Sequence, residues 1–311
     1  DTVWAISSTN LSSGTTYFWR VQAVDQDFEA STWSSQGSFT YVNPFTFTSN
    51  FIDSTGTAFS FAPPGVDNGA IDVGDIDADG DLDLIYTGAD ALNNPELYLY
   101  IYDDNRRVFD KADLSGQNIS GVRRGDIALG DVDGDGFLDL AVCGLTDNTS
   151  SNPILSVFRF DDNIGEFTSI GGFATAGISD GSLDFGDYDK DGDLDLLVTG
   201  SGGSGTQIYF NQSTVGSISF PNSSRFGIAD VDRGDAKFGD YNNDGYPDIA
   251  LMGRTKSGGK PPVVIIYLNN AGTGFTEDAI TNIPPMFSGE LNWADFNNDG
   301  FLDLMGLGVA A

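Results

Sequence analysis

The chain of 311 residues is long enough for one large or two smaller domains, and its 40% hydrophobic and 12% aromatic content indicates a folded core. Its 46 acidic and 14 basic residues give a formal net charge of −32, which disfavours binding to nucleic acid or to an anionic membrane. Because the sequence contains no histidine, catalytic mechanisms and zinc sites that need an imidazole are excluded for this chain.

Residues 1–42 do not share the pattern of the residues that follow. They contain Leu11-x-x-Gly14-x-x-Tyr17-x-x-Arg20 and then Trp33-Ser34-Ser35. These positions resemble the last strands of a fibronectin type III domain, in which Tyr17 would be the tyrosine corner. Only about half of such a β-sandwich fits into this segment, so we expect a partial module and a chain that begins inside a domain.

Residues 43–311 contain one nine-residue pattern, D-x-[DN]-x-D-G-x-x-D, five times. The copies run over Asp75–Asp83, Asp131–Asp139, Asp187–Asp195, Asp240–Asp248 and Asp295–Asp303, with a period of about 55 residues. A glycine lies six residues before each first aspartate, and another lies five residues after each last one. This register indicates a repeated structural unit.

Each repeat reads as an alternating strand, the acidic loop, an apolar strand and two further β-rich runs. Four strands in about 55 residues are typical of a β-propeller blade. We therefore predict an all-β fold, with a propeller of four-stranded blades whose first hairpins carry the acidic loops, and a partial fibronectin type III-like sandwich before it.

The loop pattern predicts calcium binding. Side chains at positions 1, 3 and 5 of a tightly curled loop can converge their oxygens, position 7 can offer its carbonyl, and position 9 can close the cage. Glycine at position 6 permits the sharp turn. The predicted ligands are Asp75, Asp77, Asp79, Asp81 and Asp83; Asp131, Asp133, Asp135, Phe137 and Asp139; Asp187, Asp189, Asp191, Asp193 and Asp195; Asp240, Asn242, Asp244, Tyr246 and Asp248; Asp295, Asn297, Asp299, Phe301 and Asp303.

The five loops differ in charge. Asp81 and Asp193 add a carboxylate at position 7, whereas Asn242 and Asn297 remove one at position 3. We expect the last two sites to bind calcium more weakly. An EF-hand is excluded because position 12 holds no acid in any copy.

The repeats resemble the FG-GAP (VCBS-type) repeats of integrin α-subunit-like β-propellers. The resemblance rests on Leu183-Asp184-Phe185-Gly186-Asp187 and Lys237-Phe238-Gly239-Asp240, and it covers about residues 44–308. It implies about five structural Ca²⁺ ions on one face of the propeller, and ligand binding on the opposite face or the rim.

The number of blades is left open by the sequence. The fifth repeat stops after its second strand at Gly308. Residues 45–62 could complete it and close a five-bladed ring, or further repeats could follow in a larger propeller, which we favour.

Basic residues gather where the connections opposite the calcium loops are expected. Candidate ligand-binding residues there are Arg254, Lys256, Lys260, Arg124 and Arg233. Alternatively, these residues balance nearby acids. Arg124 and Arg233 also open two Arg-Gly-Asp triplets, and because the glycines are repeat glycines, we attribute the triplets to blade geometry.

From these features we expect a secreted or cell-surface protein, since millimolar extracellular calcium suits such loops. The expected function is a non-catalytic calcium-binding adhesion or ligand-binding module with an extracellular protein or glycan partner, and not an enzyme. The alternative is a structural subunit of an extracellular filament or sheath, assembled from copies of itself. A third reading is the propeller part of a polysaccharide-acting enzyme. We expect no nucleic-acid partner and no membrane insertion.

Overall fold

The computed structural model describes residues 63–104, 106, 108–149, 152–170, 176–203, 205–256, 259, 261–279 and 283–310, and four short strands before them. Contacts divide the chain into two units, one of residues 1–65 with 294–303, and one of residues 66–293 with 304–311. Each unit is described by itself.

The first unit contains two antiparallel strand pairs. Strand β1 (Thr16–Trp19) pairs with β2 (Gly37–Thr40), and β3 (Ser49–Ile52) pairs with β4 (Ala58–Phe61). The strands β3 and β4 lie within residues 45–62, where the sequence predicts two strands. The rest of the fibronectin-like prediction for residues 1–42, including the Tyr17 side chain, lies outside the described residues.

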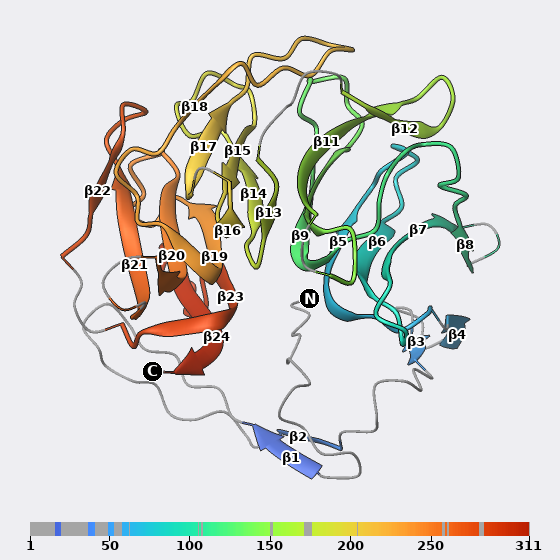
Figure 1. Cartoon of the computed structure of the whole chain (residues 1–311), viewed down its shortest axis with the longest axis horizontal. Coiled ribbons are helices and arrows are strands. Elements are labelled where there is room, and N and C mark those ends of the chain that lie inside the picture. The colour runs from blue at the N-terminus through green and yellow to red at the C-terminus, as the bar shows by residue number, and fades with distance from the viewer. Residues whose placement is uncertain are drawn as a thin grey trace. The chain divides into compact units, whose positions relative to one another are not determined.

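The second unit is a succession of antiparallel sheets (Figure 1). In the first sheet the order is β5 (Asp67–Gly74), β6 (Asp83–Ala89), β7 (Pro95–Asp103) and β8 (Val108–Lys111). The second sheet contains β9 (Arg123–Gly130), β10 (Asp139–Leu145), β11 (Pro153–Asp161) and β12 (Glu166–Ser169), and is extended by β13 (Ile178–Ser179) and β16 (Ser201–Gly202).

The third and fourth sheets repeat this order. The third contains β14 (Leu183–Gly186), β15 (Asp195–Val198), β17 (Gln207–Phe210) and β18 (Asn222–Ser224). The fourth contains β19 (Val231–Gly239), β20 (Asp248–Thr255), β21 (Pro262–Asn269) and β22 (Phe275–Glu277), and a fifth pair follows with β23 (Met286–Ala294) and β24 (Asp303–Ala310). Among the described residues the fold is all-β, and no helix is long and apolar enough to cross a membrane.

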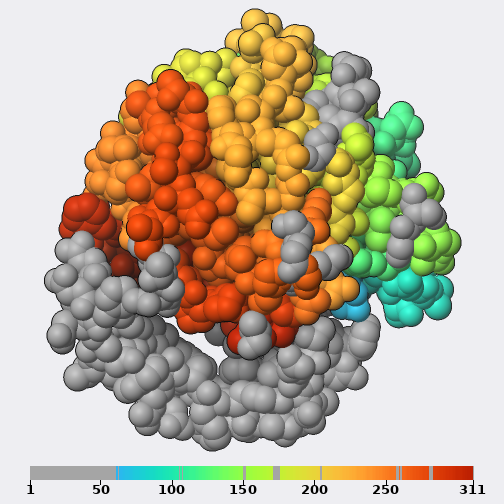
Figure 2. Space-filling view, turned by 60° about the vertical axis from the view of Figure 1, so that its left-hand side comes forward, coloured from blue at the N-terminus to red at the C-terminus, as the bar shows by residue number. Residues whose placement is uncertain are grey.

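The core lies between neighbouring sheets. Every described residue of β10 is buried, as is every residue of β15, because these second strands pack against a sheet on both faces. One apolar cluster joins the first and second sheets around Ile85 and Leu140, and others join the second to the third and the third to the fourth. The third and fourth sheets, coloured yellow to orange, form one continuous surface in Figure 2.

A bulge interrupts the first strand of the first, second and fourth repeats, near the repeat glycine. The residue before each repeat glycine has a left-handed backbone, with φ between 50° and 52° at Asn68, Arg124, Asp180, Arg233 and Ser288. The glycine then lies against the facing strand, and a Cβ added at Gly125 would lie 1.9 Å from the carbonyl oxygen of Cys143. Both Arg-Gly-Asp triplets occupy this bulge, so repeat geometry accounts for them.

Acidic side chains of the first strands connect neighbouring sheets. The Leu129 amide donates to Asp72 Oδ2 at 2.9 Å, and the Leu183 amide donates to Asp126 Oδ2 at 2.9 Å. The same link recurs from the Phe238 amide to Asp184 and from the Leu291 amide to Asp235. Burial raises the pKa of Asp126 to about 7 and that of Asp184 to about 6.

Replacing Gly125 with alanine tests the bulge. We expect Gly125→Ala to lower the free energy of unfolding by about 2–4 kcal/mol, because the new methyl group collides with a backbone carbonyl that cannot move alone. Thermal unfolding measures the change. Gly134→Asn is the control, since a Cβ there meets no atom within 4 Å and φ is 72°, so its effect should stay below about 1 kcal/mol. Equal losses in both variants would contradict the explanation.

Candidate metal centre

Each acidic loop joins the first and second strands of a repeat. The first aspartate directly follows the end of the first strand, and the aspartate at position 9 opens the second, as Asp75 and Asp83 do between β5 and β6. The loop is therefore held at both ends by sheet hydrogen bonds.

Three of the loops bring carboxylates together. One oxygen from each member of a group lies within 4.8 Å of the others in Asp75, Asp77 and Asp83, in Asp131, Asp133 and Asp139, and in Asp187, Asp189 and Asp195. The separations within each group suit one cation with oxygen ligands. The sequence predicts ligands at positions 1, 3, 5, 7 and 9 of all five loops. The groups contain positions 1, 3 and 9 of three loops, and the full ligand sets stay predictions.

Backbone amides curl the loop around its own carboxylates. In the first loop, the Gly80 amide donates to Asp75 Oδ2 at 3.0 Å, and the Asp81 amide donates to Asp79 Oδ1 at 3.0 Å. Gly80 has φ of 99°, which is readily adopted only by glycine. Equivalent bonds occur in all five loops. The position 5 carboxylates, such as Asp79, lie outside the three-acid groups.

The aspartate at position 9 also fastens the loop to the third strand. Asp83 Oδ2 accepts the Ile76 amide at 2.9 Å, and its Oδ1 accepts the Tyr102 amide of β7 at 2.9 Å. The equivalents Asp139, Asp195 and Asp248 make the same two kinds of bond. These four carboxylates are between 0% and 3% exposed. Position 9 thus ties three strands to the loop.

Two asparagines were not predicted from the sequence and link loops of neighbouring repeats. Asn211 Nδ2 donates to the carbonyl oxygens of Val132 and Leu194 at 2.8 and 3.0 Å, and Asn269 Nδ2 reaches Tyr188 O at 2.8 Å. The sequence signal is a shared aromatic-x-Asn at the end of the third strand, in Tyr209-Phe210-Asn211 and Tyr267-Leu268-Asn269.

Two carboxylate oxygens in the loops lack a hydrogen-bond partner. Asp75 Oδ1 and Asp240 Oδ1 are buried, and no donor reaches either of them among the described residues. A buried carboxylate oxygen without a donor is unfavourable unless a cation balances it. The first and fourth loops therefore fit an oxygen-bound cation.

Burial shifts the protonation of the position 9 aspartates. It raises the pKa of Asp83 to about 6 and the pKa values of Asp139 and Asp195 to about 7, although backbone donors oppose this shift. Burial also raises the pKa of Asp77, Asp133 and Asp189, and neighbouring carboxylates raise it further. Protons therefore compete with a cation near neutral pH.

The fourth and fifth loops have the same backbone course with fewer acids. Asn242 Oδ1 and Asn297 Oδ1 accept the position 5 amides at 2.8 Å, in place of a carboxylate. Asp240, Asp244 and Asp248 remain in the fourth loop, and Asp295, Asp299 and Asp303 remain in the fifth. The backbone amides of Phe137, Tyr246 and Phe301 at position 7 donate to position 5, and the carbonyl role predicted for this position stays a prediction.

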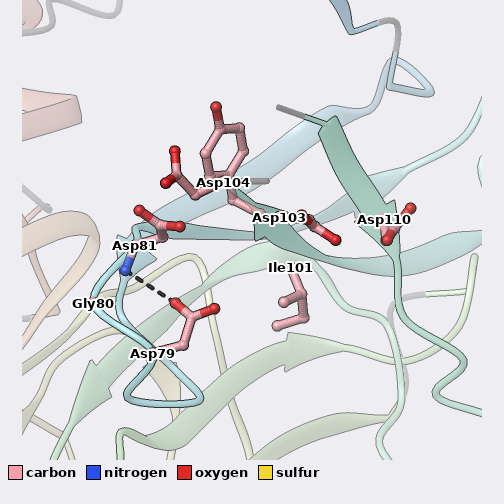
Figure 3. Close-up of a pocket in the computed structure, with 8 residues that line it drawn as sticks. Asp79, Gly80, Asp81, Ile101, Asp103, Asp104 and Asp110 are labelled. Atoms are coloured by element: carbon pink, nitrogen blue, oxygen red, sulfur yellow. Dashed lines mark hydrogen bonds between the residues drawn. The ribbon is translucent and has the colours of Figure 1, made fainter. Parts of the chain in front are cut away.

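A pocket of about 450 Å³ adjoins the first loop (Figure 3). Its lining includes Asp79, Asp81, Asp103, Asp104 and Asp110. Arg106 bridges Asp103 and Asp110, so part of this charge is neutralised. The remaining acids make the pocket unsuited to an anionic ligand.

The predicted ligand-binding bases differ in the contacts that they make. Arg124 pairs with Asp180, and the backbone amide of exposed Arg233 donates to Asp180 O at 2.8 Å. The Lys256 amide donates to Asp230 O at 2.9 Å. Arg254 differs, since its Cζ lies 3.9 Å from the centroid of the Phe287 ring. Lys260 lies outside the described residues.

Comparison with protein families explains the shared geometry of the loops. The model of the FG-GAP-like repeat matches residues 75–142, 131–198, 187–251 and 240–306. The chain belongs to the FG-GAP-like repeat family. The resemblance predicted from the strand-into-loop residues is confirmed, and each match begins at the first aspartate of a loop.

A search of curated proteins found no match for this FG-GAP-like chain. Among solved structures, it is similar to the exotype rhamnogalacturonan lyase YesX, with 14% identity and a TM-score of 0.43 over 93% of this chain and 52% of that one. It is also similar to rhamnogalacturonan lyase YesW, with 18% identity and a TM-score of 0.30 over 97% of this chain and 51% of that one. The Bacillus licheniformis rhamnogalacturonan lyase PL11 is 16% identical, with a TM-score of 0.30 over 94% of this chain and 49% of that one. The chain spans about half the length of each.

These similarities correct the functional prediction. The structures found are polysaccharide lyases, so the expected non-catalytic adhesion or ligand-binding module, with its filament alternative, is wrong, and so is the expectation of no enzyme. The functional prediction failed because the repeat pattern accounts for the conspicuous acidic residues, so no acid outside the pattern indicates a catalytic site. The third reading, a polysaccharide-acting enzyme, is the one that agrees with these structures.

The raised pKa values predict different pH responses with and without calcium. In chelator, the folded state keeps protons that the unfolded state releases near its ordinary pKa of about 4, so stability should fall as the pH rises toward 7. In millimolar calcium, an ion that holds the carboxylates ionised would remove these protons from the folded state, so stability should depend little on pH over the same interval. Calorimetric melting between pH 5 and 8 should show a Tm decrease of about 3 °C or more in chelator and a much smaller change in calcium. Parallel curves would contradict this prediction.

Proposed function

We propose that the acidic loops bind Ca²⁺ and that the ion stabilises the repeat domain. The observation that carries this proposal is the convergence of three carboxylates in each of three loops. The donor set is oxygen alone, with no histidine in the chain and its single cysteine, Cys143, buried outside the loops, which favours calcium over zinc. When bound, calcium would supply positive charge that offsets the repulsion between these carboxylates.

Hydrogen bonds of the loop carboxylates connect the proposed ion sites to the sheets. Asp75 and Asp77 hold the curled loop, while Asp83 connects it to the third strand through the Tyr102 amide. Neutralising the loop therefore favours the alignment of three strands at once. Asn211 and Asn269 would extend this stabilisation to the neighbouring repeat. The side-chain amide of each donates both to its own repeat's loop and to the loop of the preceding repeat.

For the whole domain we propose a calcium-braced β-propeller formed by residues 43–311, with four-stranded blades, preceded by a partial fibronectin type III-like module over residues 1–42. The succession of similar sheets with their first strands on the inner side in Figure 1 supports the propeller. We also propose an extracellular or cell-surface location, because weak calcium sites fill at millimolar concentration.

For the protein that contains this chain we propose an activity on polysaccharides, the function class that remains once the adhesion reading is withdrawn. No residue of this chain is assigned to catalysis. The calcium loops would hold the domain in shape, and an extracellular polysaccharide would be the partner.

Removal and exchange of loop carboxylates test the calcium proposal. Chelation should lower Tm, since each filled site adds about 2.7 kcal/mol at a hundredfold excess of calcium over Kd. Asp189→Asn gives the third loop the residue that the fourth carries at this position, and should weaken that site about tenfold; Asn242→Asp should strengthen the fourth. Calorimetric titration with calcium measures both. Asp162→Asn, outside the loops, is the control and should change neither affinity nor number of sites.

A turnover assay tests the proposed activity class. The protein that contains this chain is incubated with acidic polysaccharides in calcium and in chelator, and new chain ends are measured. We expect cleavage in calcium and a loss in chelator that follows the loss of folded protein. Absence of cleavage from every acidic polysaccharide tested, by protein shown to be folded, would contradict the proposal.

A further inference from the structure

Arg254 lies at the end of β20 that is remote from the acidic loop. It follows the repeat glycine Gly253, and its side chain is half-buried. The guanidinium stacks on Phe287 of β23, with Cζ 3.9 Å from the ring centroid, and Phe287 is 9% exposed. An arginine held in this way has a fixed plane, so little side-chain freedom is lost when its outer nitrogens bind a ligand.

Other arginines at this end of the sheets are satisfied by protein acceptors. Arg123 Nε donates to Asp147 O at 2.9 Å, Arg124 pairs with Asp180, and Arg225 pairs with Asp230. Arg254 Nε, by contrast, is buried and has no hydrogen-bond partner within the described part of the chain. The surrounding structure therefore holds the Arg254 guanidinium by its face alone.

The repeat itself does not require an arginine at this position. The residues that follow the same glycine in the other repeats are Ala89, Leu145, Ser201 and Val309. These are uncharged and mostly apolar, as expected for a position near the next sheet. Arg254 thus places a positive charge where four equivalent positions carry none, on a chain of net charge −32.

We propose that Arg254, with Phe287 as its platform, binds the carboxylate of an acidic sugar and so positions a polysaccharide substrate. The proposal rests on the polysaccharide activity proposed above and names its substrate class. A guanidinium offers two parallel N–H donors that match the two oxygens of a carboxylate. Exposed Arg233, on the partner strand β19, adds positive charge at the same end.

The sheet that carries Arg254 favours a sugar over an acidic protein surface. None of the exposed large apolar side chains among the described residues lies on β19, β20, β21 or β22, whereas Leu307 and Val309 of β24, the strand paired with β23, are exposed. A protein partner would bury an apolar centre, which the described residues of the Arg254 sheet do not expose, whereas a carboxylated sugar needs mainly polar contacts. Asp232 stands opposite Arg254 in the strand register, and its charge will keep the affinity for one carboxylate weak.

Binding of a glucuronate oligomer, measured by NMR titration in calcium at physiological salt, tests the proposal. Arg254→Gln and Arg254→Lys should each weaken binding about tenfold or more, because lysine keeps the charge but lacks the paired donors. Phe287→Leu should weaken it while leaving the net charge unchanged. Arg225→Gln is the matched control at the same end, since its guanidinium is already paired with Asp230, and binding should be retained.

Three results would overturn the proposal. One is equal weakening in Arg225→Gln and Arg254→Gln, which would indicate only general electrostatics. Another is full binding by Arg254→Lys, with a melting curve like that of the parent protein. The third is tighter binding of a polyglutamate peptide than of the glucuronate oligomer, which would identify a protein ligand. Binding is measured without turnover, so specific binding without cleavage would refute the proposed activity and not this site.

Discussion

The repulsion between aspartates within each loop is the constraint on which the structure depends. In three of the loops, three carboxylates converge within 4.8 Å, and the one at position 9 is almost fully buried. Such an arrangement is unfavourable in isolation, and the chain tolerates it through backbone amides, protonation and, as proposed, calcium. The same aspartates connect the first three strands of a repeat, so the feature that strains the loop also organises the sheet around it.

Much of the fold could be predicted because the residues that define the repeat act on the conformation of their own loop or strand. The glycine at position 6 and the aspartates at positions 1 and 9 mark the loop, and the apolar runs beside them mark the strands. The family followed from these signals. The predicted ligand sets of the five loops stay predictions, although positions 1, 3 and 9 lie together in three of them.

Contacts between repeats were harder to predict, because they depend on which residues face each other across sheets. Asp72 and Asp126 occupy different positions in their repeats, yet each accepts an amide from the next sheet. Asn211 and Asn269 likewise show their role only when two loops are seen together. The function was misjudged for a similar reason, since repeat residues describe the scaffold and carry little information about the chemistry that it supports.

The links between first strands have a mechanical consequence. Asp72, Asp126, Asp184 and Asp235 each accept an amide from the sheet that follows, so neighbouring sheets are linked in pairs. Stability in such an array resembles a sum of nearest-neighbour terms. Under force or partial denaturation, the sheets would then separate one at a time. If calcium stabilises the loops as proposed, separation would begin at a sheet whose loop has lost its ion.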